Sequence, residues 1–170
     1  MLSAGRTAAA LWRLLVSWLV LWAGFWLSFF AMLVAVDPES LDPGEPAAFA
    51  RVFALLGLAS GVLWSLGVKF LPKTGGAGAG PVRCAWIGAA AAAATPVLLG
   101  KFSQSIVFAP TGAVMGAVLS YLAMAGAKLR PAGGAWAAML CFVARGFQET
   151  PEASPSPEAG LRPSGPQNVP

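Results

Sequence analysis

Side chains that could carry out chemistry are few in this chain of 170 residues. Histidine is absent, and the two cysteines, Cys84 and Cys141, lie far apart in the sequence, which fits neither a disulfide framework nor a zinc-binding pattern. No serine or cysteine has a candidate base close to it in the sequence, and histidine is the usual base that activates such a nucleophile. We therefore expect a protein that is not an enzyme and that holds no metal ion or other cofactor.

Carboxylates are concentrated in one short stretch, DPESLDPGEP, which contains Asp37, Glu39, Asp42 and Glu45. Carboxylate oxygens are ligands that Ca²⁺ prefers, but the prolines and the spacing do not fit an EF-hand loop. A solvated acidic turn is the better interpretation of this stretch.

A row of tryptophans, Trp18, Trp22 and Trp26, repeats every four residues. Because a helix has 3.6 residues per turn, such a row forms one broad aromatic stripe. It could bind a flat apolar ligand such as a quinone, a carotenoid or a tetrapyrrole, although without histidine the chain cannot ligate haem or chlorophyll through that residue. The favoured interpretation is that these bulky side chains fill grooves beside glycine-faced helices or face lipid.

The composition is that of a membrane protein. Hydrophobic residues make up 57% of the chain and charged residues only 11%, whereas soluble domains carry about 25% charged residues. The net charge is +4, but the basic residues stand singly at the ends of apolar runs and form no patch that could bind nucleic acid.

Elements that span a bilayer need roughly 20 consecutive apolar residues. The sequence predicts an all-α integral membrane domain over residues 1–130, with transmembrane helices at about 14–36, 50–70, 84–100 and 105–127. The third is only mildly apolar and contains Pro96, so we expect it to pack among the others rather than to stand alone in lipid. Pro110 is expected in the first turn of the fourth helix, where a missing N–H costs little.

The orientation follows from the lysines and arginines, which concentrate on the cytoplasmic side of membrane proteins. With the N-terminus in the cytoplasm, nine of the 11 basic residues lie inside, and only Arg51 and Lys101 lie outside. The sequence therefore predicts a multi-pass protein of a bacterial inner membrane with both termini cytoplasmic, the bacterial origin resting on the Ala-, Gly- and Arg-rich composition.

Small residues recur every four positions on two of the predicted helices, at Gly57, Gly61 and Ser65 and again at Gly112, Gly116 and Ser120. Residues 52–65 read VFALLGLASGVLWS and residues 107–120 read VFAPTGAVMGAVLS, a similarity that a duplicated two-helix hairpin would produce. Small faces let helix backbones approach closely. A pore or substrate groove is the alternative, but the predicted helix cores contain no charge of the kind that transport pathways use, so helix packing is favoured.

The C-terminal part of the sequence divides into two segments. Residues 131–147 form an apolar piece too short to span, which we interpret as an interfacial segment. Residues 148–170 are rich in proline and poor in apolar bulk, so we expect a disordered cytoplasmic tail.

The loop DPESLDPGEP between two helices resembles that of a group of small uncharacterised bacterial four-helix membrane proteins with a DPxSxDPGE loop after the first helix. The resemblance implies the same four-helix fold, and the group has no assigned activity to carry over. The sequence favours a non-enzymatic structural or accessory subunit that packs against lipid and against a second copy or another membrane protein. The alternatives are a small transporter or channel subunit, and a binder of an apolar pigment or quinone through Trp18, Trp22 and Trp26.

Overall fold

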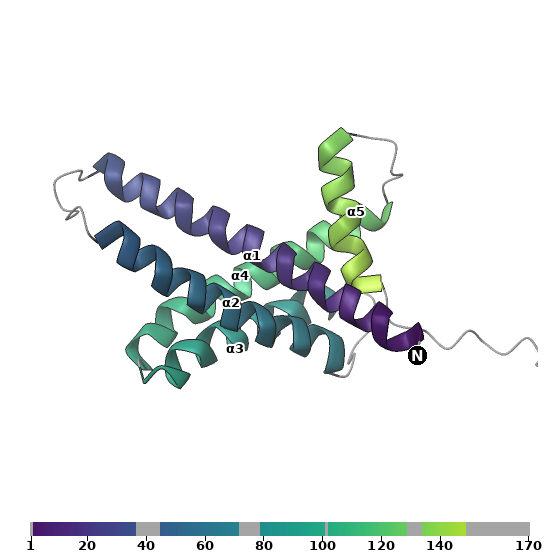
Figure 1. Ribbon diagram of the computed structural model, residues 1–170, viewed down its shortest axis with the longest axis horizontal. Helices are drawn as coiled ribbons and strands as arrows, with labels where there is room; N and C mark the ends of the chain where they lie inside the picture. The colour runs from purple at the N-terminus through teal and green to yellow at the C-terminus, as the bar shows by residue number, and fades with distance from the viewer. Residues whose placement is uncertain (1, 37–44, 72–78, 101, 129–133, 149–170) are drawn as a thin grey trace, which may run out of the picture.

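The computed structural model describes residues 2–36, 45–71, 79–100, 102–128 and 134–148 (Figure 1). Over these residues the regular structure is entirely helical, as the sequence predicts. The acidic residues Asp37, Glu39 and Asp42 and the predicted tail from residue 149 lie outside the described residues. The predictions for them therefore stay predictions. The five helices are α1 (Leu2–Val36), α2 (Glu45–Phe70), α3 (Ala79–Leu98), α4 (Phe102–Lys128) and α5 (Gly134–Gln148).

Four of these helices are long and apolar enough to cross a membrane, which confirms the predicted all-α membrane fold. The helix α1 begins well before the first predicted span, because alanine and arginine are strong helix formers and continue the helix through the more polar N-terminal residues. The helix α3 has 20 residues, which at 1.5 Å per residue gives about 30 Å, the thickness of the hydrocarbon core.

Two antiparallel hairpins make up the bundle, α1 with α2 and α3 with α4 (Figure 1). The most extensive contact between helices is that of α3 with α4, and α2 joins the two hairpins by packing on α3. The core contains the side chains that point toward these contacts, among them Trp18, Trp64, Met115 and Leu119.

The turn between α3 and α4 is short because α3 ends in a tight turn. Gly100 has a φ of 72°, a conformation that glycine adopts at helix C-termini without strain. Its N–H donates to the carbonyl of Val97 at 2.9 Å, and the N–H of Leu99 donates to that of Pro96 at 3.1 Å. The chain then enters α4 at Phe102.

Pro96 of α3 and Pro110 of α4 both lie inside their helices. Because α4 already begins at Phe102, Pro110 is in its interior, and the expectation that it would occupy the first turn is wrong. A proline inside a helix removes one backbone hydrogen bond. Near the other, Pro96, the hydroxyl of Ser105 on α4 donates to the carbonyl of Ala93 at 3.0 Å, which supplies a donor to the carbonyls of this turn.

The helix α5 covers most of the apolar segment predicted at 131–147 and lies across α1 and α4 (Figure 1). A Cβ at Gly126 of α4 would collide with the carbonyl of Leu140, and Gly146 of α5 faces the side chain of Leu14 of α1. Val143 and Ala144 are buried in this contact. At 15 residues, α5 is too short to span the bilayer.

Candidate functional site

The tryptophan row of α1 points toward α2 and fills its glycine face. Trp18 and Trp22 are 0% and 3% exposed, and Trp26 is half-buried. A Cβ added at Gly57 would lie 2.5 Å from Cδ1 of Trp22, and one at Gly61 would lie 2.7 Å from Cδ1 of Trp18. Glycine at these two positions therefore makes the space that the indole rings occupy, as the favoured interpretation of the row describes.

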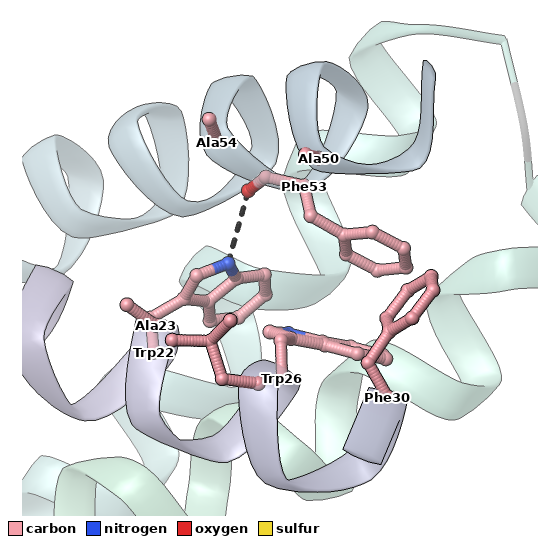
Figure 2. A pocket seen from close by; sticks show the side chains of 8 residues that line it. Trp22, Ala23, Trp26, Phe30, Ala50, Phe53 and Ala54 are labelled. Atoms are coloured by element: carbon pink, nitrogen blue, oxygen red, sulfur yellow. Dashed lines mark hydrogen bonds between the residues drawn. The ribbon is translucent and has the colours of Figure 1, made fainter. Parts of the chain in front are cut away.

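Three buried indole N–H groups find acceptors on a neighbouring helix. Trp22 donates to the carbonyl of Phe53 at 3.0 Å (Figure 2), and Trp18 donates to the hydroxyl of Ser60 at 3.2 Å. Trp64 donates to the carbonyl of Cys84 at 3.4 Å. Since hydrocarbon offers no water as an alternative partner, these bonds fix the facing helices in one register.

Beyond Trp22, the C-terminal half of α1 and the N-terminal half of α2 line an open apolar cavity of about 380 Å³. Figure 2 shows the rings of Trp26, Phe30 and Phe53 gathered in its wall, with the small side chains of α2 opposite. A second cavity of about 490 Å³ shares Trp26 and Phe53 with the first and extends to Phe108 of α4. We call these two cavities together the aromatic groove.

The glycine face of α4 meets backbone instead of rings. A Cβ at Gly112 would collide with the carbonyl oxygen of Gly88, and one at Gly116 with that of Cys84. The backbones of α3 and α4 are thus in direct contact, the closest approach that small residues permit. The structure brings the predicted packing residues Gly112 and Gly116 together with Gly88 and Cys84 of α3.

The two serines of the predicted faces are also buried. Ser65 is 3% exposed, and its hydroxyl donates to the carbonyl of Gly61 at 2.7 Å. Ser120 is 5% exposed and lies within hydrogen-bonding reach of the Cys84 thiol. Ser65 thus satisfies its hydroxyl within its own helix, and Ser120 lies against the facing helix α3, which suits a packing role.

The two hairpins share one pairing rule. In the first, Gly57 faces Trp22 and Gly61 faces Trp18. In the second, the corresponding glycines of α4 face Gly88 and Cys84, so a step of four residues along one helix always matches a step of four back along the other. Antiparallel helices that pack along rows of residues four apart share this relation in general, so the duplication of the hairpin stays a prediction.

Trp64 belongs to the same cluster, although it is not among the tryptophans or the packing residues predicted from the sequence. It is fully buried, and its ring stacks on Trp18 with the centroids 5.0 Å apart. Its position on α2, three residues after Gly61, places it on the glycine face, since residues three and four apart are neighbours on a helix. That spacing is the signal that could have found it.

Three further hydroxyl groups of the bundle donate within their own helices. Ser17, Ser60 and Thr95 donate to the carbonyl four residues earlier at 2.7, 2.7 and 2.9 Å. Within the described parts of the chain, no three His, Cys, Asp or Glu side chains gather in a way that could hold a metal ion. What this arrangement offers chemically is apolar contact, aromatic stacking and indole N–H donors.

The site is therefore defined by its geometry, an aromatic wedge between two helices beside a backbone contact between two others. Comparisons of the chain with protein-family models, with curated proteins and with solved structures found no match.

Proposed function

We propose that the chain is a non-enzymatic accessory or structural subunit of a membrane assembly. It docks through the C-terminal half of α1, residues 23–36, which lies on the outer side in the proposed orientation and is called the outer half of α1 below. The observation that carries this proposal is the exposure of that half helix. Leu27, Met32 and Val36 are 70%, 55% and 78% exposed. The most apolar window of the span Ala4–Val36 has a mean hydropathy of 2.2 and is only 6% buried within the chain.

The length of α1 adds to this argument. Its candidate span has 33 residues but includes Arg6 and Arg13, and its uncharged part, residues 14–36, is about 35 Å long against a hydrocarbon core of about 30 Å. A helix longer than the bilayer must tilt or project, and helix association is one way to accommodate such a mismatch. A partner helix along the outer half of α1 would cover apolar side chains that the other helices of the chain leave open.

The glycine faces do not provide this docking surface. The sequence suggests that two such faces exceed what four helices need, which would leave one for a second copy. In the structure, however, Gly57 and Gly61 are covered by α1, and Gly112 and Gly116 are covered by α3. A homo-oligomer or a complex with another membrane protein is therefore proposed through α1 and not through these glycines.

The position of the charges supports a role without catalysis or coupled transport. The described basic side chains of the spans, such as Arg51, Lys69 and Lys128, stand near helix ends, whereas proton relays and coupled transporters place ionisable groups within the membrane. The same charges support the proposed orientation in a bacterial inner membrane, with both termini in the cytoplasm.

A photocrosslinking experiment tests the docking surface. With p-benzoylphenylalanine in place of Met32, which is exposed and lines neither cavity of the aromatic groove, irradiation of native membranes is expected to give one discrete protein adduct, either a dimer of the chain or a complex with another membrane protein. The matched control carries the same probe at Val82, which is 60% exposed on α3, and is expected to react with lipid. Lipid adducts from both positions would contradict the proposal.

A further inference from the structure

We propose that the aromatic groove is a binding site for a flat, apolar molecule that carries a carbonyl-type hydrogen-bond acceptor, and that the indole N–H of Trp26 is the donor to this acceptor. This ligand site uses the side of α1 that faces α2 and α4. It borders the docking surface at Leu27, which lines the first cavity, but it does not include Met32 or Val36.

The first observation is an unsatisfied donor. Among the described residues, Nε1 of Trp26 is the buried side-chain nitrogen or oxygen that has no hydrogen-bond partner. The indoles of Trp18, Trp22 and Trp64 each donate to an oxygen on a facing helix. No water reaches the hydrocarbon region to satisfy such a group, and an aromatic face is a much weaker acceptor than a carbonyl. The indole N–H of Trp26 therefore lacks an acceptor among the described residues, and a bound ligand can supply one.

The second observation is the space around this indole. Both cavities of the aromatic groove are lined by Trp26 and Phe53, whose ring centroids lie 4.0 Å apart. Their volumes, about 380 and 490 Å³, fall in the range of small-molecule pockets. Nε1 of Trp26 is itself covered, so the indole must turn toward one of these cavities to present its N–H, and the cavities give it room to do so.

The third observation is the geometry of the walls, which selects the shape of the ligand. The rings of Phe49 and Phe53 are inclined by only 15°, as are those of Trp22 and Phe108. Near-parallel rings continue favourably into a further stacked ring, whereas an acyl chain offers neither a ring face nor an acceptor at this depth. Gln104 of α4 lines the second cavity and can give the ligand a further polar contact.

The experiment compares two probes of nearly equal shape, 2-methyl-1,4-naphthoquinone and 2-methylnaphthalene, by equilibrium dialysis against the full chain in lipid nanodiscs. The quinone is expected to bind about tenfold more tightly than the hydrocarbon, because only the quinone accepts the Trp26 hydrogen bond. The infrared band of the bound quinone carbonyl should also shift to lower frequency. This measurement needs no variant and tests the hydrogen bond directly.

Two matched variants locate the site. Trp26→Phe keeps a ring but loses the N–H, so quinone affinity is expected to fall about tenfold while hydrocarbon affinity stays the same. Trp86→Phe, at a position on α3 that is 73% exposed, should change neither. Equal affinities of the two probes for the native chain would overturn the proposal, as would an unshifted carbonyl band. Binding of both probes no tighter than to empty nanodiscs would also overturn the proposal, because the groove would then hold acyl chains. None of these results bears on the crosslinking at Met32, so the two proposals fail independently.

Discussion

Replacing Gly116 with alanine is expected to separate α3 from α4 and to lower the free energy of unfolding by about 3 kcal/mol or more, the upper end of what overpacking costs. The added Cβ would collide with the carbonyl oxygen of Cys84. Because that obstacle is backbone, no side-chain rotation can relieve it, and the two helices must move apart. Gly112→Ala, which meets the carbonyl of Gly88, should have an effect of similar size.

The matched control is Gly24→Ala on α1, where an added Cβ would meet nothing within 4 Å. Alanine is the better helix former by up to about 1 kcal/mol, so this change should leave stability unchanged or raise it slightly. The measurement is the fraction folded against the mole fraction of SDS in mixed micelles, followed by circular dichroism. If Gly116→Ala and Gly24→Ala unfolded at the same SDS fraction, the backbone contact between α3 and α4 would be disproved.

The Trp18→Ala variant is expected to lower the free energy of unfolding by about 3–5 kcal/mol, the range for removing a large buried aromatic side chain. Trp18 is 0% exposed, stacks on Trp64 and fills the space beside Gly61. Its loss would leave an empty volume between α1 and α2 that the rigid backbones around it cannot close. The same SDS titration measures this loss.

Two further changes separate the contributions of Trp18. Trp18→Phe keeps most of the ring but removes the N–H that donates to Ser60, at a cost of about 1 kcal/mol. Ser60 stays satisfied because its own hydroxyl donates to the carbonyl of Leu56 at 2.7 Å. Trp86→Ala, at an exposed position, should change stability by less than about 0.5 kcal/mol. A loss for Trp18→Ala as small as that for Trp86→Ala would contradict the wedge.

The four spanning helices could be predicted from the sequence because hydropathy and length alone decide which segments cross a bilayer. Their ends could not. The helix α4 extends past its predicted start to Phe102, since helix propensity continues across residues that hydropathy does not select, and Pro110 is consequently interior. The bounds of α5 differ from the predicted segment 131–147 by only a few residues. The prediction was close because glycine and the polar Gln148 bound the apolar run.

The candidate site was predicted in part. Spacing alone placed Gly57, Gly61, Gly112 and Gly116 on small faces, and it placed the tryptophan row on one side of α1. It did not show that one face takes rings and the other takes backbone, because that choice depends on which helix lies opposite. The unpartnered N–H of Trp26 could not be predicted from the sequence for the same reason, because hydrogen-bond partners depend on tertiary contacts and not on periodicity.

The difference between the two hairpins has a consequence for the spacing of their helices. Where α3 meets α4, carbonyl oxygens press on glycines, and nothing between the two helices can yield without breaking the contact. Where α1 meets α2, the contact is made by indole rings that are stacked and hydrogen-bonded. The distance between α3 and α4 is therefore set by backbone alone, whereas the distance between α1 and α2 is set by the size of the tryptophan side chains.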